Sequence, residues 1–386
     1  MPNKWQITIL VVILLIITSA FVFIKIGKTN ELEDIKTKQD TNLIDVITKP
    51  INQPLKTPEK VKGIYMTGYV FARQDLRNKL IKLVDDTELN ALVIDFKDPN
   101  GKLMFEPQND LLKTWPLSQS ALSYEAYQKI LQELQDKNIY TIARITTFQD
   151  STGANTFRDS ALKNKNGGLW LDYRGVSWLD MTNSKSWDLV VTQTKEAVLI
   201  GFDEIQFDYI RFPSDGNIKN IAYANFPSDK KKYQILDEFY TYLKANLTEL
   251  NIPLSIDLFG LTYWQRQDQN YDLGIGQRLV DAGKYFDYIS PMVYPSHYYS
   301  GILGFANPAA HPYEIVSKAM KDGNIMLANS SSTAGSRPWL QDFNMGAIYN
   351  SEMIKKQIKA CNDNNCSGWL LWNAGNKYTT GALIVE

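Results

Sequence analysis

Short apolar runs alternate with longer amphipathic stretches from residue 61 to the end of the chain. The apolar runs are nearly continuous and rich in β-branched and aromatic residues, which is typical of parallel strands covered on both faces. They predict eight strands: 63–70, 91–97, 140–148, 204–211, 253–259, 286–294, 324–329 and 368–373. The stretches between them have helical periodicity and predict seven helices: 75–89, 123–137, 184–200, 229–250, 273–284, 312–322 and 350–364.

This alternation of strands and helices is the pattern of a (β/α)8 TIM barrel, an α/β fold. A doubly wound open sheet is the alternative, but no G-x-G-x-x-G follows the first strand. No change of composition within 61–386 marks a further domain boundary. We therefore expect residues 61–386 to form one TIM-barrel domain.

The first 60 residues have a different character. Residues 7–24 (ITILVVILLIITSAFVFI) carry no charge, and at about 1.5 Å rise per residue they just cross a hydrocarbon core of about 30 Å. The tripeptide TSA inside this run is a weak cleavage site for a signal peptide, but apolar residues continue beyond it. We expect residues 1–27 to be an uncleaved single-pass anchor in the cell membrane, with a signal peptide as the alternative. Residues 28–60 are polar and dotted with proline, which predicts a flexible linker to an extracytoplasmic domain. An ordered extension that packs on the domain around residues 43–51 is the alternative.

Composition excludes several classes of function. The chain has 41 basic and 42 acidic residues and no long basic run, so it lacks the electrostatic footprint of a nucleic-acid-binding protein. Two cysteines and two histidines are too few for a metal centre built from these ligands, and we expect neither a metal nor a cofactor. Outside the membrane, Cys361 and Cys366 favour a small structural disulfide loop. The 21 Tyr, 16 Phe and 9 Trp suit a cleft for flat, partly apolar ligands.

Three of the apolar runs end in an aspartate: Asp95, Asp208 and Asp257. If these side chains face the barrel interior, three carboxylates converge at the carboxyl-end mouth, where barrel enzymes build their sites. A buried aspartate requires a partner, for which Lys97 and Arg144 are candidates. A single aspartate of this kind is as readily a salt-bridged strand cap, but three at equivalent positions favour a function.

Two connections are far longer than a helix requires. Residues 149–183 follow the third predicted strand and residues 330–350 follow the seventh. Long loops at the carboxyl ends of barrel strands are frequently functional. These loops and the strand ends carry aromatic residues that suit sugar stacking: Tyr69, Trp170, Trp178, Tyr294, Trp339 and Trp372.

Carboxylates and aromatic rings together favour glycoside hydrolysis, which uses one carboxylic acid and one carboxylate. A serine hydrolase is disfavoured because G-x-S-x-G is absent. A Mg²⁺ or Ca²⁺ site at Asp95, Asp98 and Asp208 has no specific spacing signature. A metal-dependent deacetylase is disfavoured because two histidines far apart in sequence make a poor ligand set.

The segment GFDEIQFDYIRFPSDG (201–216) closely resembles the fourth-strand signature of the putative glycoside hydrolase family that is also catalogued as domain of unknown function 4015. Further blocks resemble that family in the same order: VKGIYMTGYVF, ALVIDFKDPNG, FDYISPMVYPSHY, RPWLQDF and GWLLWNAGN. The resemblance covers 61–386 and implies a TIM barrel and a glycosidase. By analogy with related barrel hydrolases it implies Asp208 as the nucleophile, with Asp257 or Asp342 as the acid.

We therefore expect Asp208 to attack the anomeric carbon or to stabilise an oxocarbenium-like transition state, and Asp257 to be the acid/base. Other residues are assigned to bind the substrate or to position this pair: Asp95, Lys97, Arg144, Gln206, Arg211, Tyr294, Trp339, Gln341, Asp342 and Trp372. Within this set Arg211 is expected to position the end of the Asp208 strand. The expected partner is an extracytoplasmic polysaccharide or oligosaccharide. A non-catalytic glycan-binding barrel and a structural envelope protein are the alternatives.

Overall fold

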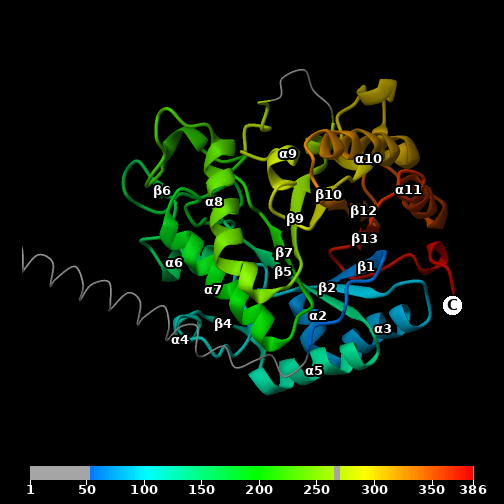
Figure 1. Ribbon diagram of the computed structural model, residues 1–386, viewed down its shortest axis with the longest axis horizontal. Coiled ribbons are helices and arrows are strands. Elements are labelled where there is room, and N and C mark those ends of the chain that lie inside the picture. Colours follow the sequence, from blue (N-terminus) through cyan, green and yellow to red (C-terminus); the bar gives the residue numbers. More distant parts are fainter. Residues whose placement is uncertain (1–52, 265–269, 386) are drawn as a thin grey trace, which may run out of the picture. The chain divides into compact units, whose positions relative to one another are not determined.

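A closed barrel of parallel strands forms the centre of the computed structural model, which describes residues 53–264 and 270–385 (Figure 1). Eight strand positions follow one another in this part of the chain: β1 (Val61–Met66), β2 (Ala91–Asp95), β5 (Tyr140–Thr146), β7 (Glu204–Asp208), β9 (Leu254–Phe259), β10 (Tyr288–Met292), β11 with β12 (Gly335–Ser336 and Trp339–Gln341) and β13 (Gly368–Trp372). Each pairs in parallel with the next, and β13 pairs with β1 to close the barrel. The predicted (β/α)8 architecture is confirmed.

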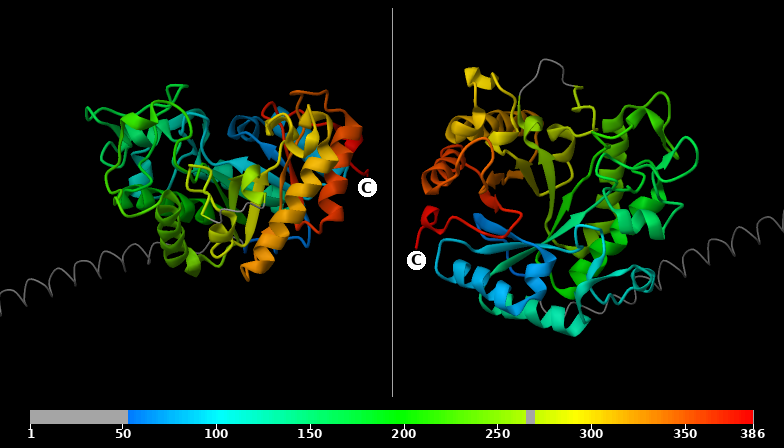
Figure 2. Two further views of the ribbon diagram at one scale, coloured as in Figure 1. Left: turned by 90° about the horizontal axis from the view of Figure 1, so that it is seen from above. Right: turned by 180° about the vertical axis from the view of Figure 1, so that it is seen from behind.

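Helices surround the strands on the outside (Figures 1 and 2). The longer ones are α3 (Gln74–Asp85), α5 (Tyr124–Asp136), α7 (Ser184–Ile200), α8 (Lys232–Leu247), α10 (Pro312–Asn329) and α11 (Ser351–Asp363). The shorter ones are α2 (Gly68–Ala72), α4 (Asp110–Lys113), α6 (Ser151–Thr156) and α9 (Leu279–Ala282). Side chains cap several N-termini, as when the Ser123 hydroxyl accepts from the Ala126 N–H at the start of α5. The apolar faces of the helices pack on the outward-facing residues of the strands, which form the main hydrophobic core.

Small elements decorate the connections between strands and helices. Two short strands, β3 (Leu103–Phe105) and β4 (Leu117–Leu122), pair in parallel. Another pair, β6 (Lys163–Asn164) and β8 (Ile221–Ala222), is antiparallel and joins the loops that follow β5 and β7. Single turns of 3₁₀-helix occur at Ile218–Asn220, Thr248–Leu250, Gly260–Tyr263, Pro295–His297, Ile302–Gly304, Pro308–Ala310 and Thr380–Ala382.

The predicted strand at 324–329 is wrong, because these residues form the last turns of α10. The seventh barrel position consists instead of β11 and β12, separated by Arg337 and Pro338. Proline cannot donate to a strand ladder, and a buried arginine interrupts the apolar run by which strands are recognised. Trp339 and Gln341 therefore lie on a barrel strand and not in a loop after it. The predicted helix 273–284 contracts to α9.

The amino-end half of the barrel interior is filled by side chains. Arg337 is fully buried and donates from both Nη atoms to the Glu204 carboxylate, which also accepts from the Tyr140 and Ser255 hydroxyls. Apolar side chains pack beside this ion pair, among them Val93, Ile142 and Leu370. The barrel is a packed core here, so an interior cavity is confined to the carboxyl end.

The chain that leads into β1 packs on the domain before the first strand begins. The Leu55 N–H donates to Asp203 Oδ1 at 2.7 Å, and the Thr57 hydroxyl lies 3.1 Å from the Tyr140 hydroxyl. Leu55 and Thr57, within the range 28–60 that was predicted as a linker, therefore contact the domain. No helix within residues 53–264 and 270–385 is long and apolar enough to cross a bilayer, and the segment 7–24 lies outside the described residues.

The predicted disulfide is present between Cys361 and Cys366. Cys361 lies near the end of α11 and Cys366 two residues before β13, so the bridge closes the turn between them. Both cysteines are buried, which fits the expected structural role.

Candidate active site

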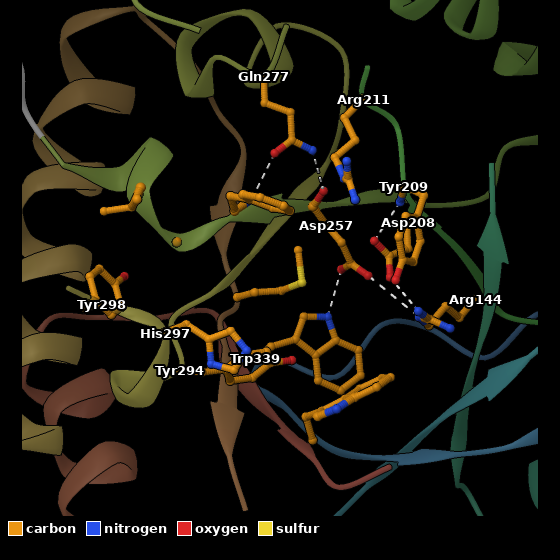
Figure 3. Close-up of a pocket in the computed structure, with 15 residues that line it drawn as sticks. Arg144, Asp208, Tyr209, Arg211, Asp257, Gln277, Tyr294, His297, Tyr298 and Trp339 are labelled. Atoms are coloured by element: carbon orange, nitrogen blue, oxygen red, sulfur yellow. Dashed lines mark hydrogen bonds and ion pairs between the residues drawn. The ribbon is translucent and has the colours of Figure 1, made fainter. Parts of the chain in front are cut away.

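The three strand-end aspartates lie at the carboxyl end of the barrel because the strands are in register there. Asp95 on β2 is opposite Arg144 on β5, and Asp208 on β7 is opposite Thr146. Asp257 on β9 is opposite Ser290 on β10. Figure 3 shows the Asp208 and Asp257 carboxyl groups directed into the same space beside Arg144.

Arg144 connects all three acids. Its Nη1 donates to Asp95 Oδ1 at 2.7 Å and its Nη2 to Asp208 Oδ2 at 2.5 Å, while its Nε lies 4.0 Å from Asp257 Oδ2. Burial alone would lower the pKa of Arg144, but the adjacent Asp208 and Asp95 outweigh it and raise that pKa well above its usual value. A permanent positive charge therefore lies between the carboxylates. Arg144 was expected as a partner of these buried aspartates.

Asp257 has the environment of a protonated carboxylic acid. It is 1% exposed, and burial together with the neighbouring Asp208 raises its pKa well above its usual range. Arg144 and a hydrogen bond from the Trp339 indole Nε1 to Asp257 Oδ1, 2.8 Å long, act in the opposite direction. The balance favours the form that can donate a proton.

Asp208 is held by donors on both of its oxygens. Oδ2 accepts from Arg144, and Oδ1 accepts from the backbone N–H of Tyr209 at 2.6 Å. Tyr209 has a φ of 55°, which is uncommon for a residue with a side chain and marks local strain. The strained turn points the amide of Tyr209 at Asp208 and places its ring in the wall of the cavity.

Gln277 connects the strands that carry the two carboxylates. The ladder between β7 and β9 ends at the pair Phe207 and Ile256, one residue before Asp208 and Asp257. Beyond it, Gln277 Oε1 accepts from the Phe259 N–H at 2.9 Å. Its Nε2 donates to the carbonyl oxygens of Ile210 and Asp257, at 3.2 and 3.4 Å. One buried amide thus replaces the missing ladder and holds the two strand ends together.

A cavity of about 450 Å³ opens beside these groups. Seven of the residues predicted for the site line it: Arg144, Asp208, Arg211, Asp257, Tyr294, Trp339 and Trp372. Its other lining residues were not predicted: Tyr209, Phe259, Gly260, Leu261, Gln277, Met292, His297 and Tyr298. Most of these follow the carboxyl ends of β7, β9 and β10. Their position after a strand is the same signal that led to the predicted residues, and it could have identified them as well.

The aromatic wall is built from rings that also pack on one another. Trp372 stacks on Tyr65 with ring centroids 4.1 Å apart, and Trp339 meets Trp372 edge to face at 5.4 Å. Tyr294 packs against His297 and Phe343. These contacts fix the orientation of the rings, so the wall is preorganised for a flat ligand.

Five of the predicted site residues do not line the cavity. Asp95 lies behind Arg144 and accepts from the Tyr65 hydroxyl. Lys97 is fully buried in an ion pair with Asp150, 2.5 Å long, and so is not a partner of the strand-end acids. Gln206 donates to the Ser290 hydroxyl inside the barrel.

The other two lie at the carboxyl end of β12: Gln341 is its last residue and Asp342 follows directly. Gln341 accepts from the Ser296 N–H and donates to the Phe343 carbonyl, which joins two loops. Asp342 accepts from the N–H and the hydroxyl of Thr379. Because both of its oxygens are bound and it does not line the cavity, Asp342 is poorly placed to be the acid.

The long loop after β5 contributes less to the cavity than its aromatic content suggested. Trp170 and Trp178 are buried; the Trp170 indole donates to the Asn217 carbonyl, and Trp178 packs beside Tyr209. Neither lines the cavity. Within the part of the chain that the structure describes, no group of three His, Cys, Asp or Glu residues is arranged to hold a metal ion.

Several solved structures are similar to this chain. A hypothetical protein from Ruminiclostridium thermocellum ATCC 27405 is 33% identical, with a TM-score of 0.45, over 50% of this chain and 96% of that one. An alpha-galactosidase from Thermus thermophilus matches at 10% identity and a TM-score of 0.50, over 83% of this chain and 60% of that one. A cycloalternan-degrading enzyme from Trueperella pyogenes matches at 9% identity and a TM-score of 0.51, over 87% and 46%. The likeness to these two enzymes concerns the fold alone, and this chain spans less than two thirds of either.

Comparison with curated protein sequences gave no match. The family model described as a putative glycosyl hydrolase domain matches residues 63–378. The matched range includes every barrel strand from Gly63 in β1 onward, together with Asp208 and Asp257. The resemblance noted in the sequence blocks is therefore confirmed, and the chain belongs to the family of putative glycosyl hydrolase domains.

Proposed function

We propose that the protein is a glycoside hydrolase whose reaction is carried out by Asp208 and Asp257. The observation that supports this most is the pair itself: two carboxyl groups on adjacent strands, both beside Arg144, in one cavity with aromatic walls. Glycoside hydrolysis requires two such groups in different protonation states. Burial and the charge of Asp208 provide that difference, because they raise the pKa of Asp257.

The roles follow from the contacts of each carboxyl group. Asp257 donates its proton to the glycosidic oxygen as the bond to the leaving sugar breaks. Asp208, oriented by Arg144 and by the Tyr209 N–H, attacks the anomeric carbon or stabilises the positive charge that develops there. A water molecule then adds to the anomeric carbon and gives a proton to Asp257, which releases the sugar and restores both carboxyl groups. Gln277 keeps the two groups at a fixed separation. Asp342, the other candidate acid, is occupied by Thr379.

The substrate class follows from the walls of the cavity. Trp339, Trp372 and Tyr294 line the cavity, and aromatic rings are surfaces on which a pyranose stacks. A volume of about 450 Å³ is sufficient for sugar units. We therefore propose a polysaccharide or oligosaccharide substrate.

We further propose that the apolar segment 7–24 anchors the protein in the cell membrane and leaves the barrel outside, where envelope or environmental glycans are the available substrates. The test is fractionation of cells that express the full chain, followed by external protease. Recovery in the membrane fraction, with degradation of the barrel in intact cells, is expected. A barrel protected from external protease would contradict the location.

The function is tested by the release of reducing ends from a panel of bacterial and plant polysaccharides. Wild-type protein is compared with Asp208→Asn and with Asp342→Asn as the matched control. Release by the wild type and the control, with a loss of at least about 10³-fold in Asp208→Asn, is expected. Binding of a glycan by wild type and Asp208→Asn alike, without release by either, would instead indicate a non-catalytic glycan-binding barrel.

A further inference from the structure

Arg211 is a second cation in the cavity, and no acidic side chain among residues 53–264 and 270–385 forms an ion pair with it. It lies three residues after Asp208 and is 6% exposed. Figure 3 shows its guanidinium directed from the rim toward Asp208 and Asp257. Arg144 forms ion pairs with Asp95 and Asp208, whereas no carboxylate oxygen in the described part of the chain lies within 4.0 Å of an Arg211 nitrogen. Buried cations ordinarily have such a partner.

The contacts of Arg211 fix its plane and leave one edge open. Its Nη1 donates to the Phe212 carbonyl and to the Ser214 hydroxyl, both at 3.2 Å. Its guanidinium carbon lies 5.0 to 5.2 Å from the centroids of three rings: Trp178, Phe259 and Tyr209. The Nε and Nη2 atoms donate to no acceptor among residues 53–264 and 270–385. These two nitrogens form the side-on edge whose spacing matches the two oxygens of a carboxylate.

The charges around Arg211 leave room for an anion. Burial lowers the pKa of Arg211, and Tyr209, Asp208 and Asp215 oppose this without reversing it. Arg174, a neighbouring cation, lowers the pKa further. An arginine stays protonated in proteins, so a ligand anion at the open edge would compensate a charge that the cavity leaves only partly balanced.

We propose that the cavity takes a sugar that carries a carboxylate, as in a uronic acid, and that Arg211 binds this carboxylate through Nε and Nη2. This inference rests on the proposed glycosidase function and names its substrate class, an acidic glycan. The pyranose ring lies against the aromatic wall, and its carboxylate pairs with the guanidinium. Arg211 was expected to position the end of the Asp208 strand. Its Nη1 bonds hold the segment that follows this strand, at Phe212 and Ser214, and Nε and Nη2 are left for the ligand.

The test compares ligand binding without turnover. Full-length protein is titrated calorimetrically with glucuronate, glucose and glucose 6-phosphate, as wild type, Arg211→Lys and Arg211→Met. Methionine keeps the length and apolar stem of arginine, and circular dichroism checks that each variant is folded. Lysine retains the charge and removes the two-nitrogen edge.

The wild type is expected to bind glucuronate at least about tenfold more tightly than glucose. Arg211→Met is expected to abolish that preference while glucose binding stays within about twofold, and Arg211→Lys to retain part of it. Equal affinity of the wild type for glucuronate and glucose, no detectable binding of glucuronate, or an undiminished preference in Arg211→Met would overturn the proposal. Stronger binding of glucose 6-phosphate would overturn the carboxylate in favour of a phosphate. A glucuronate preference without glycan release would instead retain the acidic ligand and remove the hydrolase function.

Discussion

The hydrogen bond from Trp339 to Asp257 allows the protonation state of the proposed acid to be tested separately from its presence. Trp339→Phe removes the indole N–H that donates to Asp257 Oδ1 at 2.8 Å and keeps a ring in the same place. That bond lowers the pKa of Asp257, so its loss must raise the pKa. A hydrogen bond to a charged group contributes about 1.5–3 kcal/mol, and one pKa unit corresponds to about 1.4 kcal/mol. Because a protonated carboxyl group still accepts a weaker bond, we expect a rise of about one unit.

The assay is the pH dependence of kcat/KM on the glycan that the wild type cleaves. If Asp257 is the general acid, activity requires its protonated form and falls as pH rises through its pKa. Trp339→Phe is therefore expected to shift the alkaline limb of the profile upward by about one pH unit. The limb should move even if the absolute rate falls through lost stacking.

Trp372→Phe is the matched control, because Trp372 lines the same cavity but stacks on Tyr65 and does not bond to Asp257. Its alkaline limb should stay where the wild type has it. A shift of the acidic limb in Trp339→Phe would show that Asp257 works in its ionised form. An unchanged profile would refute the link between this hydrogen bond and the reaction.

Three further predictions concern stability. Asp257→Asn should unfold at a higher temperature than the wild type at pH 7.5. Because the pKa of Asp257 is raised in the folded state, the stability difference is absent below the unfolded pKa near 3.8 and grows by about 1.4 kcal/mol per pH unit up to the folded pKa. Equal melting temperatures of the two proteins at pH 7.5 would contradict this reasoning. Gln277→Met leaves three backbone groups unbonded, so kcat should fall and unfolding should become easier by about 2–4 kcal/mol in urea titration; a changed KM with intact kcat would argue against a positioning role. Lys97→Met leaves the Asp150 charge buried without its partner and should lower the free energy of unfolding by about 3–5 kcal/mol. The double variant with Asp150→Asn should recover most of this loss. A raised KM in the double variant would indicate that Lys97 binds the substrate after all.

The fold was predictable because its signal is local. The runs around Asp95, Asp208 and Asp257 are continuous and apolar, and their alternation with amphipathic helices specifies a barrel. The seventh strand was not predicted because a buried charged residue, Arg337, interrupts its apolar run and is compensated by an ion pair. Arg337 meets Glu204, which lies 133 residues earlier in the chain, and no local pattern reports such a partner.

The site was predictable where it coincides with strand ends and hidden where it depends on loops. Asp208, Asp257 and Arg144 follow from the side-chain period of a strand and from parallel register. Gln277 lies in a connection without regular structure. It bonds to backbone groups at the ends of two other segments, Phe259 and Ile210, and no local sequence pattern indicates such contacts. Lys97 shares the strand pattern of the residues that line the cavity, yet Asp150 in the loop after β5 pairs with it.

In the proposed reaction Asp257 supplies the proton and Asp208 meets the anomeric carbon. These two roles are separated by the rates of wild type, Asp257→Asn and Asp208→Asn on two glycosides of the cleaved sugar, one with a dinitrophenyl and one with a sugar leaving group. A dinitrophenolate leaves without protonation. We expect Asp257→Asn to lose far more activity on the sugar leaving group than on dinitrophenyl, and Asp208→Asn to lose activity on both. Equal losses of Asp257→Asn on the two substrates would contradict this expectation.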